Sequence, residues 1–174
     1  MGQQRIGETV LSTDQVREGI GRVANLINGD FSSAVIITVV PGGILATADL
    51  VRQLTFDIEM DYISCPHTPG ERNNASPIVY HHNIPIAGRD VIVVDDAIES
   101  GGTMKRVVAK LEAYEPASLS VATLFVKPGR VDIPARQYFG YEMDSDEMLV
   151  GFGLPLHDRL HNLPYVARLG ANDV

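Results

Sequence analysis

The residues best placed to do chemistry follow a short apolar run in the middle of the chain. Val91–Val94 is followed at once by two acids, Asp95 and Asp96, and then by the segment Ser100-Gly101-Gly102-Thr103. Glycines lack a Cβ, so backbone amides can close on an anion, and the two hydroxyls add donors at the start of a helix. Carboxylates at the carboxyl end of a strand can accept hydrogen bonds from sugar hydroxyls. The segment therefore predicts a site for a phosphorylated sugar.

A buried strand and an amphipathic helix would hold this segment in place. The four β-branched residues of Val91–Val94 predict a strand that is buried on both faces. After the glycines, Met104, Val107, Val108 and Leu111 have the spacing of one helical face. The alternative is that two acids and two glycines merely end a buried strand. The strand, the acids, the glycine turn and the helix occur together and in order, and this favours a binding site.

The same order of strand, glycine turn and helix occurs once earlier in the chain. Ala34–Val40 reads as an apolar strand that ends at a proline and two glycines, and the helical stretch Ile44–Leu54 follows. Loops at the carboxyl ends of adjacent parallel strands converge on one crevice. We therefore expect the turn Val40-Pro41-Gly42-Gly43 to face the ligand of the Asp95–Thr103 loop, with its amides near a second phosphate. The alternative is a simple turn between a strand and a helix.

The remaining elements predict an α/β fold with a central, mostly parallel sheet flanked by helices, in a single domain of residues 1–174. A capping box at Ser12–Gln15 predicts the start of an amphipathic helix. The segment at about 65–77 has no periodicity and is predicted to be a mobile lid. Further strands are predicted at Asp57–Ser64, Leu119–Lys127, Tyr138–Met143 and Met148–Gly153.

The composition excludes several classes of partner. The chain has 174 residues, with 22 acidic and 14 basic side chains and a formal net charge of −8. Nucleic acid is excluded as the main partner because phosphate backbones need a basic face. No apolar run reaches membrane-spanning length, so no membrane partner is expected. Cys65 is the single cysteine and cannot form an internal disulfide, which fits a cytoplasmic location.

The run from Val91 to Thr103 resembles the phosphoribosyl-pyrophosphate (PRPP) signature of the type I phosphoribosyltransferases. Less specific motifs extend the resemblance from about Ala34 to Tyr165. The resemblance implies a core at about 30–130 and a small hood over a base site, built from about 131–169 and the N-terminal segment. It further implies PRPP and a purine base as substrates, Mg²⁺ as cofactor, and a homodimer or homotetramer.

The resemblance assigns the two glycine loops to the two ends of PRPP. Asp95 and Asp96 would bind the ribose, and they are also the candidate contacts to Mg²⁺, indirectly through the ribose and water. Ser100, Gly101, Gly102 and Thr103 would complete the ribose 5-phosphate site. The loop Val40-Pro41-Gly42-Gly43 would bind the pyrophosphate and contain a cis peptide. Pro41 stands where the family usually has lysine, and an X-Pro bond adopts cis more readily than other bonds, so we predict cis geometry at Val40-Pro41.

The base site is assigned to residues that follow two later strands. Lys127 follows a strand end, and although it would by itself be a solvated lysine, the 6-oxopurine branch has a lysine there that donates to the base O6. Met148 and Leu149 lie in a segment that resembles the base-binding segment of that branch. Glu99 occupies the position of the acid that serves the purine N7, so it is the candidate catalytic residue.

Several residues depart from the pattern of the branch. Glu99 replaces an aspartate, and Met148 replaces an aromatic side chain that stacks on the base. Pro155 replaces an aspartate that holds magnesium, and His161 replaces an arginine that touches pyrophosphate. The usual serine-tyrosine motif of the lid is absent as well. His157 and His161 are four residues apart, as two metal ligands can be, but an ordinary loop histidine is the simpler interpretation.

The resemblance favours a 6-oxopurine phosphoribosyltransferase of the hypoxanthine-guanine type, which makes a nucleoside monophosphate and pyrophosphate from PRPP and a base. Two alternatives stay open. One is a phosphoribosyltransferase for xanthine or adenine, although Lys127 argues against adenine because its exocyclic amine is also a donor. The other is a non-catalytic protein that binds PRPP or a nucleotide and has lost efficient chemistry.

Overall fold

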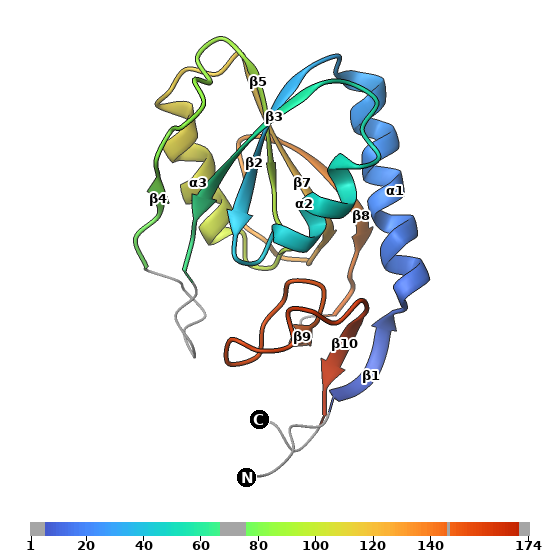
Figure 1. Cartoon of the computed structure of the whole chain (residues 1–174). Helices are drawn as coiled ribbons and strands as arrows, with labels where there is room; N and C mark the ends of the chain where they lie inside the picture. Colours follow the sequence, from blue (N-terminus) through green and yellow to red (C-terminus); the bar gives the residue numbers. More distant parts are fainter. Residues whose placement is uncertain (1–5, 67–75, 146, 171–174) are drawn as a thin grey trace.

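The computed structural model describes residues 6–66, 76–145 and 147–170, which form two sheets and three helices (Figure 1). The central sheet has the strand order β4-β3-β2-β5-β7-β6, and β8 also pairs with β7. All its pairings are parallel except that of β3 with β4. Its strands are β2 (Ala34–Val40), β3 (Ile58–Ser64), β4 (Val79–Tyr80), β5 (Asp90–Val94), β6 (Ala97–Ile98), β7 (Ser118–Val126) and β8 (Arg136–Glu142). The predicted α/β fold is confirmed.

Helices cover both faces of this sheet. The helices are α1 (Thr13–Asp30), α2 (Ile44–Val51) and α3 (Gly102–Glu112). The strand β5 shows how the two layers divide the core, because its side chains alternate between the faces. Ile92 and Val94 pack in one apolar cluster with α1 and α2, and Val91 and Val93 pack in the other with α3. The prediction that this strand is buried on both faces is confirmed.

The helix signals of the sequence are confirmed, with one change at a helix end. Ser12 caps α1, and the Ser12 side chain and Gln15 exchange hydrogen bonds with each other's backbone as a capping box. The helix α2 ends at Val51 and does not reach Leu54. The amides of Gln53 and Leu54 bond to carbonyls only three residues back, so the chain tightens into a turn there.

A small antiparallel sheet, which we call the hood sheet, lies beyond the carboxyl ends of β2 and β5 (Figure 1). Its order is β1-β10-β9, with β1 at Ile6–Leu11, β9 at Leu149–Val150 and β10 at Val166–Leu169. The chain therefore brings an N-terminal and two C-terminal segments together over this edge of the central sheet. The predicted strand Met148–Gly153 is shorter in the structure, because Gly151 and Phe152 have φ values of 99° and 50° and turn the chain.

The predicted start of the hood at residue 131 is too early. The strand β8 pairs in parallel with β7 along most of its length, so it belongs to the central sheet. The helix α1 likewise packs on that sheet, so the core region begins before residue 30, where it was predicted to start. Most of the predicted lid at 65–77 falls on residues 67–75, which lie outside the described residues. Among the helices that the structure describes, none has the length and apolar character needed to cross a membrane.

Candidate active site

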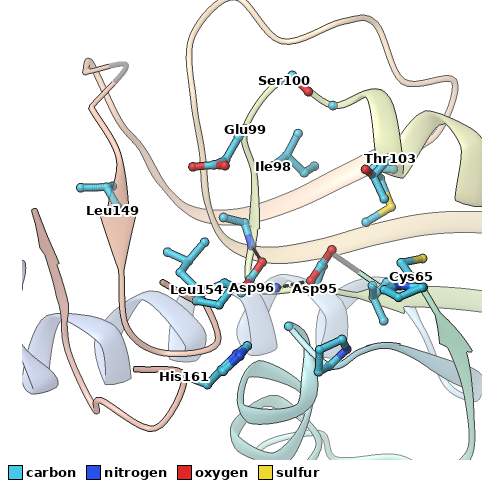
Figure 2. A pocket seen from close by; sticks show the side chains of 18 of the residues that line it. Cys65, Asp95, Asp96, Ile98, Glu99, Ser100, Thr103, Leu149, Leu154 and His161 are labelled. Carbon is cyan, nitrogen blue, oxygen red and sulfur yellow. Dashed lines mark hydrogen bonds between the residues drawn. The ribbon is translucent and has the colours of Figure 1, made fainter. Parts of the chain in front are cut away.

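A pocket of about 410 Å³ lies between the carboxyl ends of β2 and β5 and the hood side of the molecule. Figure 2 shows Asp95 and Asp96 at its centre, with Glu99, Ser100 and Thr103 on one side and His161 on the other. The residues of its wall that the sequence analysis predicted as site residues are Pro41, Gly42, Asp95, Asp96, Glu99, Ser100, Gly101, Thr103, Met148 and Leu149. Val40, Gly43, Gly102 and Lys127, which were also predicted, lie next to the wall without lining it.

The two acids at the end of β5 lie side by side, with Asp96 buried and Asp95 half-buried. The Asp96 amide donates to Asp95 Oδ1 at 2.8 Å, and the Ala97 amide donates to Asp96 Oδ1 at 2.6 Å. Burial, and next the charge of Asp96, raises the pKa of Asp95 well above its usual range. Burial raises the pKa of Asp96 to about 6, against the opposing effect of its hydrogen bonds. Two neighbouring acceptors that have lost much of their water are suited to a ligand that brings hydroxyl donors.

The turn after β2 packs directly on these acids. The Val40-Pro41 peptide is cis, as predicted. A Cβ on Gly42 would lie 2.9 Å from Asp96 Oδ2, so only glycine fits there without displacing the acid. The Gly43 amide donates to Val39 O at 2.7 Å and is already used inside the turn. The ligand-facing part of this turn is therefore Pro41 and Gly42, which line the pocket.

The second glycine loop ends at the N-terminus of α3. Gly101 is the N-cap with φ of 83°, a conformation that favours glycine, and it has no side chain to cap the helix amides. The nearby hydroxyl of Ser100 lies 3.4 Å from the Gly102 amide. Ser100, Gly101 and Thr103 all line the pocket. Helix amides without a side-chain cap, together with two hydroxyls, form a suitable site for a phosphate group.

An ion pair lies at the side of the pocket away from β2. Lys127 Nζ is 2.9 Å from Glu99 Oε1 and donates to the carbonyl of Glu147 at 2.6 Å. The Lys127 side chain is only 5% exposed, whereas that of Glu99 is 50% exposed and lines the pocket. An ammonium has three N–H donors, so these two contacts leave one for a ligand. Lys127 thus lies behind Glu99, and the direct contact with a base that the sequence predicted for it stays a prediction.

Three of the residues that depart from the pattern of the branch, Met148, Pro155 and His161, lie on the hood side of the pocket. Met148 is 61% exposed and Leu149 only 4% exposed. His161 lines the pocket with its Nδ1 2.8 Å from the carbonyl of Gly153. A carbonyl only accepts hydrogen bonds, so Nδ1 carries the hydrogen and Nε2 is the other ring nitrogen available to a ligand. Pro155 also lines the pocket and offers no metal ligand.

Some wall residues were not predicted as site residues. Leu154, Asp158 and Cys65 line the pocket. Burial raises the pKa of the Cys65 thiol to about 12, so it remains a neutral, apolar part of the wall. Asp158 lies in a loop where φ is positive at His157, Asp158 and Leu160, and no local sequence signal places such a loop against a distant strand.

The arrangement of acids limits how a metal could be held. In residues 6–66, 76–145 and 147–170, no three His, Cys, Asp or Glu side chains converge to hold a metal ion. Mg²⁺ is commonly bound through one or two carboxylates together with substrate phosphates and water. Asp95 and Asp96 fit that role with a phosphorylated ligand present.

Comparisons with known proteins identify one family. Residues 8–155 match the family model of the phosphoribosyl transferase domain. The chain is 29% identical to a hypoxanthine-guanine phosphoribosyltransferase of Staphylococcus epidermidis, over 93% of each chain. It is 31% identical to a hypoxanthine phosphoribosyltransferase of Salmonella typhimurium, over 79% of each. A crystal structure of a Bacillus anthracis hypoxanthine-guanine phosphoribosyltransferase matches with a TM-score of 0.84 and 31% identity, over 95% of this chain and 100% of that one.

Proposed function

The chain belongs to the phosphoribosyltransferase family, and from this premise we propose that it transfers the phosphoribosyl group of PRPP to a 6-oxopurine, hypoxanthine or guanine. The products are IMP or GMP and pyrophosphate, so the reaction serves purine salvage. The observation that carries the proposal is one pocket that joins the acids of β5 and the α3 phosphate loop to the ion pair of Glu99 and Lys127. A sugar phosphate and a polar base can be held there side by side.

The ribose 5-phosphate half of the substrate lies at the end of β5. Asp95 and Asp96 accept hydrogen bonds from the ribose hydroxyls, and Ser100, Gly101, Gly102 and Thr103 hold the 5-phosphate at the start of α3. The turn Val40-Pro41-Gly42-Gly43 faces the pyrophosphate, chiefly through Pro41 and Gly42. These contacts hold C1 of the ribose at a fixed place between the two loops.

The bond changes take place at C1 of the ribose. The bond from C1 to pyrophosphate breaks with oxocarbenium character on the sugar, and N9 of the base then forms the new bond from the opposite face. The base loses a proton, which Glu99 accepts at N7. The third N–H of Lys127 donates to the oxo group at C6, and Met148 and Leu149 cover the base. Lys127 therefore holds both the base and the residue that takes its proton.

We propose Mg²⁺ as the cofactor of this reaction. Asp95 and Asp96 would hold it, indirectly through the ribose of PRPP and water. Bound magnesium would neutralise charge on the departing pyrophosphate. The family resemblance also supports a homodimer or homotetramer and a cytoplasmic location as parts of the proposal.

The direct test supplies PRPP and magnesium with hypoxanthine, guanine, xanthine and adenine separately, and quantifies nucleotide and pyrophosphate. Turnover with hypoxanthine or guanine supports the proposal, and turnover with xanthine or adenine alone replaces the base that we propose. Absence of turnover on protein that binds PRPP would favour the non-catalytic alternative.

A variant of Glu99 tests the assigned chemistry. We expect Glu99→Gln to lower kcat about 100-fold, because an amide cannot accept the proton, while the KM for PRPP stays unchanged. Glu142→Gln is the matched control, since Glu142 is similarly exposed and pairs with Arg130 outside the pocket wall. Equal turnover of Glu99→Gln and wild type would remove Glu99 from its role.

A further inference from the structure

A series of contacts connects the Glu99 side chain to the hood sheet. Lys127 Nζ contacts both Glu99 Oε1 and the carbonyl of Glu147, at 2.9 and 2.6 Å. The carboxylate of Glu147 in turn pairs with Arg168 of β10. Glu147 is therefore held at two points, by its backbone from the central sheet and by its side chain from the hood sheet.

The segment that Glu147 belongs to is short and leads into β9 of the hood sheet. Ser145 Oγ donates to Glu147 Oε2 at 3.0 Å and accepts from the Glu147 amide at 3.1 Å, which makes a local turn. The strand β9 that follows has two residues, and Arg168 of β10 lies opposite Leu149 in it. Met148 and Leu149, which come directly after Glu147, line the pocket. Glu147 is thus joined directly to this part of the pocket wall, which β10 also holds where the Leu169 amide donates to the Met148 carbonyl at 3.4 Å.

Arg168 is placed to fix that position from outside the pocket. Its Nη1 donates to Glu8 of β1 at 2.7 Å, and its Nε forms an ion pair with Glu147 that lacks hydrogen-bond geometry, so one guanidinium links β1, β10 and the segment before β9. Arg168 is not part of the described pocket wall. A planar guanidinium with separate donors can hold two carboxylates at once, which an ammonium on a flexible stem does less well.

We propose that Arg168 is a positioning residue for base recognition, acting through Glu147 on Lys127 and on the wall at Met148 and Leu149. The Arg168 guanidinium fixes the Glu147 carboxylate, the Glu147 carbonyl then holds the Lys127 ammonium, and its remaining donor stays directed at the base. The ribose and phosphate contacts at Asp95 and the start of α3 do not depend on this series. The proposal rests on the proposed function, because it assigns the base side of the same pocket.

The test compares two ligands that share the sugar phosphate and differ in the base. Dissociation constants for GMP and for ribose 5-phosphate are measured on the full chain by equilibrium titration, together with the KM values for base and PRPP. We expect Arg168→Gln to weaken GMP binding about three- to fivefold and to raise the KM for the base by a similar factor, as suits a partly exposed ion pair. Ribose 5-phosphate binding, the KM for PRPP and the melting temperature should stay at their wild-type values.

Three further variants complete the experiment. Glu8→Gln is the matched control, because it removes the outer partner of Arg168 and leaves the contact with Glu147, so it should bind GMP as wild type does. Glu147→Gln should reproduce Arg168→Gln, and the double variant should be no weaker than either single one. Arg168→Lys should recover part of the affinity.

The outcomes separate failure of this inference from failure of the proposed function. Wild-type protein that binds ribose 5-phosphate and not GMP would contradict the proposed function. If Arg168→Gln bound GMP as tightly as wild type does, the inference would be overturned and the proposed function would stand. Equal weakening of GMP and ribose 5-phosphate, or a lowered melting temperature with both, would show a general structural role and would also overturn it.

Discussion

At the scale of single residues, the most consequential pair is Asp95 and Asp96. Both lie at the end of β5, where the loss of surrounding water raises the pKa of each, and that of Asp96 to about 6. In the free protein, the charged form of a carboxyl is unfavourable when it has lost its hydration and no cation lies beside it. Under the proposed function, hydroxyl donors of the bound ribose would add to the two backbone amides that already donate to these acids. Binding of the ligand should therefore stabilise this part of the fold.

This pair predicts an unusual dependence of stability on pH. Because the pKa of Asp96 is raised in the folded state to about 6, the folded protein keeps a proton that the unfolded chain loses near pH 4. The contribution of Asp96 to the free energy of unfolding should therefore fall as the pH rises from about 4, and this contribution should level off above about pH 6. The loss attributable to Asp96 is on the order of 3 kcal/mol from the difference between 3.8 and about 6.

The measurement is urea unfolding of wild type and Asp96→Asn between about pH 4 and about pH 7, where the wild type should lose stability relative to the variant as pH rises. The asparagine has no such proton to lose. Parallel stability curves for the two proteins would contradict the assignment.

At the scale of elements, α1 begins at a capping box that the sequence already contains. Ser12 Oγ accepts from the Gln15 amide at 3.2 Å, and Gln15 Oε1 accepts from the Ser12 amide at 2.9 Å. The apolar stripe of α1, with Val16, Ile20 and Val23, packs on the central sheet from this point on. The cap therefore fixes where the helix starts and which residues face the core.

Removal of the cap should destabilise the protein without changing its site. We expect Ser12→Ala to lower the free energy of unfolding by about 1 kcal/mol, because a helix amide loses its acceptor. Ser12→Asp retains an oxygen acceptor and a favourable charge at the helix N-terminus, so it should remain near wild type. Urea unfolding measures both, and ribose 5-phosphate binding at low temperature should be the same in all three proteins. Equal stability of Ser12→Ala and wild type would contradict the role of the box.

At the scale of the whole molecule, a single glycine sets how closely the hood side approaches the central sheet. A Cβ on Gly153, whose φ is 101°, would lie 2.1 Å from the carbonyl of Gly42 and 3.2 Å from Asp96 Oδ2. The Gly153 amide and carbonyl both bond to His161, the former to its backbone and the latter to its ring. Backbone of the segment after β9 thus lies directly against the turn after β2.

Gly153→Ala should push the segment after β9 away from the turn after β2. The methyl group meets backbone and not a flexible side chain, and the φ value is unfavourable for alanine as well. We expect a loss of about 2 kcal/mol in the free energy of unfolding and at least about tenfold weaker PRPP binding. Thermal unfolding and a PRPP titration provide the measurement. Gly29→Ala is the control, because no atom lies within 4 Å of a Cβ there, and PRPP binding as tight in Gly153→Ala as in this control would refute the close contact.

Local patterns in the sequence predicted the central sheet, the helix α1 and both glycine loops. The two-sided burial of Val91–Val94 and the cap at Ser12 depend on neighbours within a few residues, and the structure agrees with them. Asp95 and Asp96 were found in the same way, because a strand end and a glycine turn are local signals. Glu99 and the cis peptide at Val40-Pro41 followed from the family resemblance; the structure contains the cis peptide and places all three acids in one pocket.

Tertiary structure decided what depends on residues far apart in the chain. It paired β1 with β10, placed β8 in the central sheet and put Lys127 behind Glu99 and against Glu147. It also brought His161 and Asp158 into the pocket wall. Sequence determines local backbone geometry and which faces are apolar, because those depend on near neighbours. Ion pairs and close backbone contacts depend on how separate elements pack, and packing is a property of the folded chain alone.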